Sequence, residues 1–453
     1  MNQNGQNTKD GSAASISSQG AGASETYATD KSVETPAMAS ATGEGSKTTV
    51  RRHRRLQTFS SLGYRDYRLL WFGTLFSSSG QWIQQATLSW LTYQMTGSPF
   101  LLGAINGVRS LPILVFSPFG GVAADRVDRK KLMLGTQLWI MVVSAAFATI
   151  IVSGRVQVWH LFAFTLFTGM GWAFNMPVRQ SIVPRLVPRE ELSNALALNS
   201  AGFNATRILG PTAAGILIAL LGPGENFYLQ SAAYLGVVWM VFLMNVPTIP
   251  KAAAASLGAN LREGAAYIWK HPTLRTQMSL ALVPVVVSFP YTSLMPIFAK
   301  DVLNVGSAGF GMLMSAPGIG AVIGTLILAS MGESKHKGFL LLGNIFSFGV
   351  LLVLFSLVHI FFVSLLILVF VGATQMVYMT TNQTLLQISA PDEMRGRVMG
   401  IFVLNQGLLP LGSLLAGSLS DVFNAPFAVL LMGSATCLLA FAFFWKARSL
   451  RTV

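Results

Sequence analysis

Long apolar segments alternate with short polar connections through most of this chain, and twelve of the apolar segments are long enough to cross a bilayer. About 20 predominantly apolar residues span the hydrocarbon core as a helix. Backbone polar groups in lipid must be paired within the protein, which favours helices. The pattern predicts an all-α polytopic membrane protein with twelve transmembrane helices, at about 67–94, 98–124, 132–152, 158–182, 192–221, 227–246, 275–299, 306–331, 338–358, 360–387, 395–420 and 426–446.

Two polar stretches divide the apolar pattern. The first residues are rich in Ser, Ala, Gly and Thr and end in the basic cluster 51–55, which predicts a disordered tail because too little apolar surface is available to bury. The connection between the sixth and seventh spans carries apolar residues at helical spacing and predicts an amphipathic helix at the membrane surface. The expected organisation is a disordered cytoplasmic tail (1–57), a six-helix bundle (58–246), a cytoplasmic linker (247–274) and a second six-helix bundle with a short basic tail (275–453).

The two sets of six spans share a faint internal repeat. Five residues of the first half, namely Phe167, Gly169, Gln180, Pro188 and Glu190, have identical counterparts 203 positions later, at Phe370, Gly372, Gln383, Pro391 and Glu393. A parallel repeat of this kind places a pseudo-twofold axis along the membrane normal. We therefore expect two pseudo-symmetric six-helix bundles.

The charges follow the predicted connections. The chain has a formal net charge of +14, and basic residues gather in every second connection, while only Arg155 and Lys300 fall in predicted outside loops. Short cytoplasmic loops carry such an excess of Lys and Arg. The expected location is a cell (inner) membrane with both termini cytoplasmic, and the positive charge requires no nucleic-acid partner.

Composition argues against catalysis. The single cysteine, Cys437, permits neither an internal disulfide nor a thiolate zinc site. No cluster of Asp, Glu or His shares one depth in the spans, and no G-x-x-x-x-G-K-[ST] loop is present, which argues against ATP-driven transport. We expect no catalytic residues, metal or cofactor, and an intramembrane enzyme is the remote alternative.

Three motifs point to one family. The hairpin after the second span reads G-x-x-x-D-R-x-x-R-K-K from Gly121 to Lys131, which resembles the loop 2–3 signature of the major facilitator superfamily of transporters. The run 207–211, Arg-Ile-Leu-Gly-Pro, followed by Gly215 resembles the Gly-Pro motif of exporters in that family. The stretches 80–84, 96–99 and 175–180 resemble the multidrug efflux branch related to the enterobactin exporter.

The resemblance implies a secondary active transporter that works by alternating access. It implies export of a small amphiphilic molecule such as a siderophore, macrolide or other drug-like compound, with protons as a candidate coupling ion and a monomer in the lipid bilayer. Uptake of an anionic small molecule is the alternative. It also implies a conformational latch at the hairpin, formed by Gly121, Asp125, Arg126, Arg129 and Lys130. A plain topogenic turn is the competing interpretation of this hairpin.

The family architecture places spans one, four, seven and ten around the substrate cavity. Polar and aromatic residues of these spans are the cavity candidates: Gln81, Gln84, Gln85, Trp172, Asn175, Tyr291, Gln375, Tyr378 and Asn382.

Arg109 and Arg207 fall near the middle of their spans. Inserting an arginine at that depth costs about 2.5–3.5 kcal/mol, so it normally marks an interior partner or a water-filled cavity. No carboxylate lies at comparable depth in the sequence, which also weakens the case for proton coupling. Two interpretations stay open: capping of backbone carbonyls and polar side chains (Asn106, Asn199 or Asn204), or contact with an anionic substrate group. Gly210 and Pro211 complete this intramembrane set of candidates.

Overall fold

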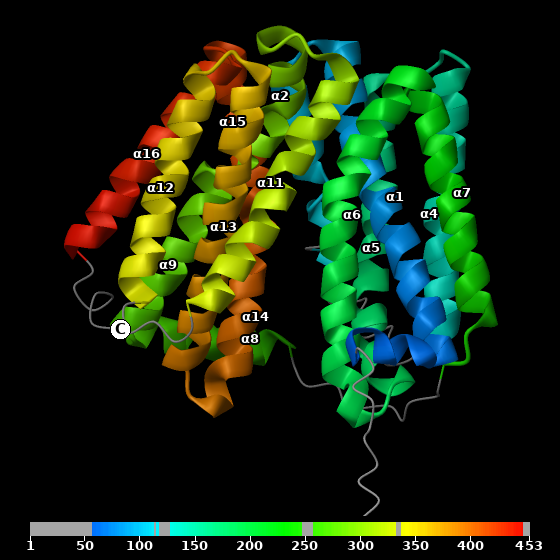
Figure 1. The fold of residues 1–453 in the computed structure, drawn as a ribbon, viewed down its shortest axis with the longest axis horizontal. Coiled ribbons are helices and arrows are strands. Elements are labelled where there is room, and N and C mark those ends of the chain that lie inside the picture. Colours follow the sequence, from blue (N-terminus) through cyan, green and yellow to red (C-terminus); the bar gives the residue numbers. More distant parts are fainter. Residues whose placement is uncertain (1–56, 113–114, 117–126, 247–256, 332–336, 447–453) are drawn as a thin grey trace, which may run out of the picture. The chain divides into compact units, whose positions relative to one another are not determined.

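The computed structural model describes residues 57–112, 115–116, 127–246, 257–331 and 337–446, and these are helical with short connections (Figure 1). The elements of the first half are η1 Gln57–Gly63, α1 Arg65–Thr96, α2 Pro99–Val108, α4 Arg129–Val152, α5 Val158–Leu186, η2 Arg189–Glu191, α6 Leu192–Leu220 and α7 Pro223–Leu243.

The second half begins with the short helix α8 and contains two interrupted spans. Its elements are α8 Leu257–Lys270, α9 Pro272–Val287, η3 Phe289–Leu294, α10 Met295–Ile297, η4 Phe298–Val302, α11 Gly306–Ser330, α12 Lys337–Leu357, α13 Phe361–Ser389, α14 Asp392–Asn405, η5 Gln406–Leu408, α15 Leu409–Val422 and α16 Ala425–Lys446.

Ten spans formed by these helices are long and apolar enough to cross a membrane, by length and composition, among the described residues. The other two predicted spans correspond to α1 and α2. Helix α1 is long enough, with 32 residues, but it carries many polar residues and is therefore less apolar than the ten spans. Several of these polar residues, such as Thr74, Ser77 and Thr87, are almost fully buried against other helices. Helix α2 is apolar and has 10 residues, because it ends at Val108 before a turn at Arg109 and Ser110; much of the remaining second predicted span lies outside the described residues. The all-helical membrane fold predicted from the sequence is confirmed.

The turn between α1 and α2 shows how local sequence sets helix ends. Gly97 adopts a left-handed conformation (φ 59°), and its N–H donates to the carbonyl of Tyr93, which is the usual way for glycine to end a helix. The Ser98 side chain accepts a hydrogen bond from the Leu101 N–H, and Pro99 starts the next helix. Both residues are favoured at these positions.

Two spans of the second half are broken. The seventh ends its α-helix at Val287 and continues as η3, α10 and η4, with Pro290 and Pro296 near the starts of the short elements. The eleventh is divided into α14 and α15 by η5, with Pro410 at the start of α15. Proline removes a backbone donor and clashes with the preceding turn, so both breaks have a local cause.

Two close helix crossings join the halves. Helix α2 crosses α15 where a Cβ atom at Gly103 would overlap the carbonyl oxygen of Ser413. Helix α6 crosses α11 where a Cβ atom at Gly215 would overlap the carbonyl oxygen of Ser307. Small residues permit such close backbone approach within membranes. The two crossings tie each half to the other through equivalent spans.

Glycine contacts inside each half repeat with the sequence. In the first half, Gly169 of α5 packs against Pro112, and in the second half Gly372 of α13 packs against Pro317 of α11. These two contacts join corresponding spans, four with two and ten with eight. The predicted pseudo-symmetry therefore has a structural counterpart.

Helix α8 lies in the connection where the sequence predicts an amphipathic helix. Its Ile268 is buried in an apolar cluster with Leu274, Leu386 and Val398, whereas Trp269 is 73% exposed. Glu263 of α8 forms an ion pair with Arg397 of α14, with 2.6 Å between Oε1 and Nη1. The helix is thus attached to the second set of spans.

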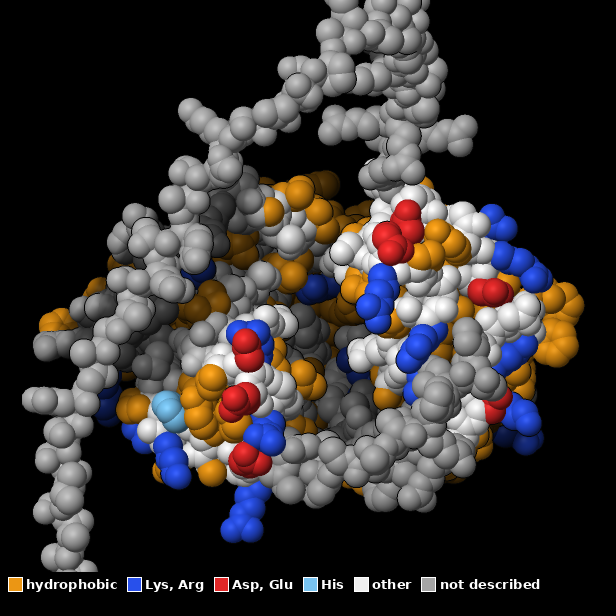
Figure 2. Space-filling model, turned by 90° about the horizontal axis from the view of Figure 1, so that it is seen from below, with side chains coloured by type: hydrophobic (Ala, Val, Ile, Leu, Met, Phe, Trp, Pro, Cys, Tyr) orange, Lys and Arg blue, Asp and Glu red, His pale blue; other side chains and the backbone are white. Residues whose placement is uncertain are grey.

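One face of the molecule is hollowed between the two sets of helices. Figure 2 shows this face, on which η1, α8 and α14 lie, with Lys and Arg side chains around the hollow. The exposed basic residues at the helix ends of this face include Arg65, Arg185, Arg262 and Arg395. Arg155 and Lys300 lie at the other ends of their helices, as the sequence pattern predicts.

Candidate functional site

A polar cavity between α1, α2 and α5 brings together five residues selected from the sequence. It has a volume of about 80 Å³. Gln81, Gln84, Gln85, Arg109 and Trp172 all line it, together with Leu88, Ile105, Asn106, Ser110, Thr168 and Gly169. One cation among amide and hydroxyl groups, beside an aromatic ring, can bind an amphiphilic molecule that carries an anionic group.

Gln84 is fixed by hydrogen bonds at the back of this cavity. Its Oε1 accepts from Gln230 of α7 at 2.8 Å, and its Nε2 donates to the Thr168 hydroxyl of α5 at 3.0 Å. The side chain is almost fully buried, so it holds three helices together. Gln81 and Gln85, one turn apart and partly exposed, remain accessible for ligand contact.

Arg109 follows the last turn of α2 and is half-buried. Its guanidinium forms no hydrogen bond or ion pair with any residue that the structure describes. Asn106, a partner considered from the sequence, instead donates to the Leu102 carbonyl at 3.1 Å and accepts from Ser89 at 3.2 Å. The donors of Arg109 are therefore available to a ligand in the cavity.

Arg207 lies in α6 and faces the second half. The hydroxyl of Tyr291, from η3, is within electrostatic range of it. Tyr291 is fully buried, and its hydroxyl has no hydrogen-bond partner among the described residues. The guanidinium of Arg207 makes no hydrogen bond within the described part of the chain, so it caps no backbone carbonyl among these residues. The Asn204 amide, a partner considered from the sequence, donates instead to the Ser200 carbonyl.

Gly210 and Pro211 place α6 between two other helices. A Cβ atom at Gly210 would lie 2.6 Å from Cβ of Trp82 in α1. The Pro211 carbonyl oxygen meets Gly311 of α11 so closely that a Cβ atom there would overlap it. The Gly-Pro motif thus connects α1 of the first half with α11 of the second.

Four further cavity candidates occupy different surroundings. Asn175 is fully buried and donates to the Thr136 hydroxyl of α4 at 3.0 Å. Tyr378 is buried and donates to the Leu280 carbonyl at 2.7 Å. Asn382 is also buried, while Gln375 is partly exposed. Of these four, Gln375 has the accessibility that a ligand contact needs.

Only part of the hairpin proposed as a latch can be described. Gly121, Asp125 and Arg126 lie outside the described residues. Arg129 begins α4, and the Lys130 ammonium lies 5.8 Å from the centre of the Phe242 ring, a cation–π distance.

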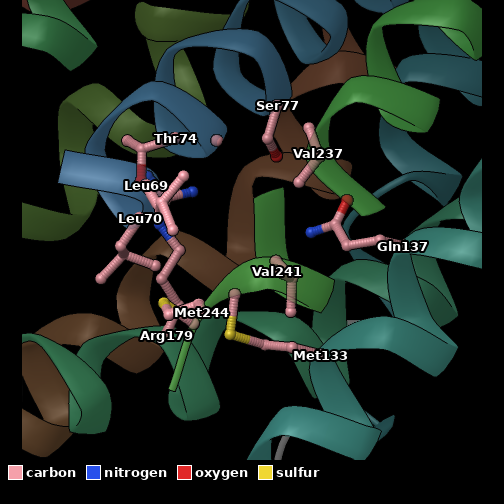
Figure 3. Close-up of a pocket in the computed structure, with 11 residues that line it drawn as sticks. Leu69, Leu70, Thr74, Ser77, Met133, Gln137, Arg179, Val237, Val241 and Met244 are labelled. Atoms are coloured by element: carbon pink, nitrogen blue, oxygen red, sulfur yellow. The ribbon is translucent and has the colours of Figure 1, made fainter. Parts of the chain in front are cut away.

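Two features of the structure were not selected from the sequence. Tyr93 of α1 donates a hydrogen bond to the Asp301 carboxylate, and the Lys300 ammonium lies 5.4 Å from the Tyr93 ring centre. Arg179 of α5 lines a second cavity, with Thr74, Ser77 and Gln137 (Figure 3). The sequence signal for Arg179 was its position within a predicted span. Arg179 was not selected, because it lies close to Arg185 and to the end of that span.

Curated relatives of the chain are efflux and siderophore transporters. It is 28% identical over 386 residues to the staphyloferrin A transporter of Staphylococcus aureus, covering 83% of this chain and 96% of that protein. It is 24% identical to macrolide efflux protein A of Streptococcus pyogenes, covering 82% and 94%. It is 25% identical to the multidrug efflux pump Tap of Mycolicibacterium fortuitum, covering 78% and 88%.

Solved transporter structures share the fold. A POT family transporter matches with a TM-score of 0.71 at 13% identity, over 87% of this chain and all of that chain. A bacterial homologue of the human lysosomal transporter Spinster matches with a TM-score of 0.67 at 14% identity, over 86% and 98%. The sequence profile described as "transmembrane secretion effector" matches residues 56–453. The chain therefore belongs to this family of the major facilitator superfamily and is a multi-pass membrane transporter.

Proposed function

We propose that this protein is a secondary active exporter of a small amphiphilic molecule that carries an anionic group. The observation that carries the proposal is the cavity between α1, α2 and α5, where Arg109 has no counter-charge among the described residues and lies with Gln81, Gln85 and Trp172. The aromatic ring and aliphatic side chains suit an apolar body, and the guanidinium suits a carboxylate, which it can bind through two parallel hydrogen bonds.

The relatives support this substrate class and the outward direction. One is named a siderophore transporter and two are named for macrolide or multidrug efflux. The hollow between the two sets of helices lies on the face that carries most basic residues, which the positive-inside rule makes cytoplasmic. Both termini are cytoplasmic in this proposal, the protein acts as a monomer, and protons are the candidate coupling ion that the protonophore test below examines.

Uptake of an anionic nutrient is the second candidate function, favoured by Arg109 and Arg207. An accumulation assay separates the two. Cells with and without the protein are given a carboxylate siderophore, a macrolide and a cationic dye, each with and without a protonophore.

Export predicts lower accumulation of the anionic amphiphile in cells with the protein, and a protonophore should abolish the difference. Uptake predicts higher accumulation. The variant Arg109→Gln should lose transport of the anionic compound, whereas Arg155→Gln, an exposed loop arginine at the opposite end, is the matched control. Transport by Arg109→Gln equal to that of the wild type would reject the role of Arg109 in anion binding.

A further inference from the structure

A second cavity lies among the helices of the first half, apart from the Arg109 cavity. Helices α1, α4, α5 and α7 enclose it, and it shares no lining residue with the other cavity. Its volume is about 10 Å³, close to the smallest volume that holds one water-sized species. Figure 3 shows Arg179 extending from α5 towards the α1 residues Leu69 and Thr74, with the Gln137 amide on the opposite side.

The polar atoms around this cavity lack partners in the protein. Of the lining residues, Thr74 is 2% exposed, Ser77 1% and Gln137 1%, and one oxygen of each has no hydrogen-bond partner among the described residues. Each unsatisfied buried group of this type costs about 1–3 kcal/mol, so three of them around one small cavity indicate a missing common partner.

The charge of Arg179 decides the chemistry of that partner. Its guanidinium forms no ion pair with any described residue, and Asp66, the carboxylate at the start of α1, instead accepts a hydrogen bond from the Asn245 N–H at 2.9 Å. A guanidinium has only donors, and the hydroxyls of Thr74 and Ser77 can donate as well. The Gln137 amide can present its nitrogen after a rotation, since the oxygen and nitrogen are assigned from the surrounding network.

We propose that this cavity binds one small monovalent inorganic anion of the chloride class. A cation would be repelled by Arg179, and the cavity has no room for a substrate or a carboxylate with its carbon skeleton. The bound anion neutralises Arg179 and accepts hydrogen bonds from the hydroxyls of Thr74 and Ser77, so it connects α1 and α5. The site is independent of the transported substrate.

Thermal unfolding of the purified full-length protein tests the proposal. The unfolding midpoint is measured in sodium gluconate, with chloride or bromide replacing gluconate at constant ionic strength. A ligand that binds only the folded state raises the midpoint with its concentration, so chloride and bromide should raise it saturably by about 2 °C or more. Identical midpoints in gluconate and chloride would overturn the proposal.

Variants locate the effect. Arg179→Gln should abolish the halide dependence, and Ser77→Ala, which removes one donor to a charged ligand, should raise the half-saturating chloride concentration about tenfold or more. Arg109→Gln is the matched control for loss of a span arginine and should keep the dependence. If Arg179→Gln does not fold, Ser77→Ala and Thr74→Val decide the matter: unchanged half-saturation in both would overturn the proposal.

Discussion

At the scale of single residues, an arginine within a membrane span needs a specific compensation, because its insertion costs about 2.5–3.5 kcal/mol. Arg109 meets a polar cavity and Arg207 lies close to a buried tyrosine of the other half. Neither forms an ion pair with a residue that the structure describes. A ligand that enters and leaves is a suitable partner for both, since a permanent carboxylate would compete with it.

Arg207 should require a guanidinium and not merely a positive charge. A planar fork with five donors can bind a carboxylate and polar side chains together, whereas lysine offers a point charge. We expect transport by Arg207→Ala to fall about tenfold or more and Arg207→Lys to be impaired as well, because one hydrogen bond to a charged group contributes about 1.5–3 kcal/mol. Transport is measured at equal expression. An alanine variant that transports like the wild type would show that Arg207 neither contacts the substrate nor positions a group that does.

The hydrogen bond between Tyr93 and Asp301 should stabilise the contact between the ends of α1 and η4. Tyr93→Phe removes the donor but keeps the ring, and since Asp301 is exposed we expect a shift of about fivefold towards a state in which this contact is broken, or about 1 kcal/mol. The measurement is the rate at which an impermeant maleimide labels a cysteine introduced near this end. Thr96→Ser, which keeps a hydroxyl one turn away, is the control, and equal labelling rates in Tyr93→Phe and wild type would contradict the expectation.

Sequence reasoning selected some of the residues that line the cavities and missed others for identifiable reasons. Arg109 and Arg207 were visible because each interrupts a long apolar run. Arg179 was not selected, because Arg185 lies nearby and two basic residues close together are typical of the end of a span. Tyr93 and Asp301 come from distant parts of the chain, and only the folded structure brings them together.

At the scale of helices, glycine determines how closely the two halves approach. The crossings of α2 with α15 and of α6 with α11 each place a glycine against a backbone carbonyl of the other helix. Such contacts leave no room for a side chain, and they allow helices to separate and rejoin without rearranging bulky groups. The close crossings thus suit helices that must move during transport.

Bulky substitution at either crossing should disturb transport. Gly103→Leu and Gly311→Leu force a side chain against the carbonyls of Ser413 and Pro211, and we expect a cost on the order of 1–3 kcal/mol to the observed packing. Transport should fall about tenfold, and spin labels on α2 and α15, and on α6 and α11, should report longer distances. Gly236→Leu, in α7 with no atom near its Cβ position, is the matched control. Unchanged distances at both crossings would contradict the prediction.

Helix positions were largely predictable because they depend on local hydrophobicity. The fifth span was expected at 192–221 and α6 covers Leu192–Leu220. The break in the seventh span has a local cause in Pro290 and Pro296, whereas Pro284 stays inside α9. The break between α14 and α15 was not anticipated, because one proline in an otherwise apolar run gives a weak signal and the local packing decides the outcome.

At the scale of the whole molecule, the two halves repeat one plan. The contacts of Gly169 with Pro112 and of Gly372 with Pro317 occupy equivalent places, as the repeat of 203 residues predicts. Two similar halves joined by a few close crossings can open to either side with little change inside each half. That property follows from the packing of the helices and could be anticipated from the sequence only through the repeat.

The orientation of this plan in the membrane follows from charge. Basic residues concentrate at the helix ends of one face, and Arg155 and Lys300 lie at the opposite ends. Because short cytoplasmic loops carry the excess of Lys and Arg, we expect a cysteine at position 155 to be labelled by an impermeant maleimide from outside intact cells. A cysteine at position 337, where α12 begins, should be labelled only after the membrane is opened.

The background for this labelling is Cys437→Ser, which removes the native thiol of α16. Cys437 is partly buried and its Sγ lies 3.6 Å from the Phe346 carbonyl, so serine retains the polar contact at similar size. The two positions are separated by five helix passages, counting the interrupted seventh span as one, so they must face opposite sides if every predicted span crosses the membrane. Labelling of both cysteines from the same side would mean that one of these helices does not cross, and α6 or the broken seventh span would then be the first to examine. Reversed labelling would instead keep every crossing and invert the direction of transport that we propose.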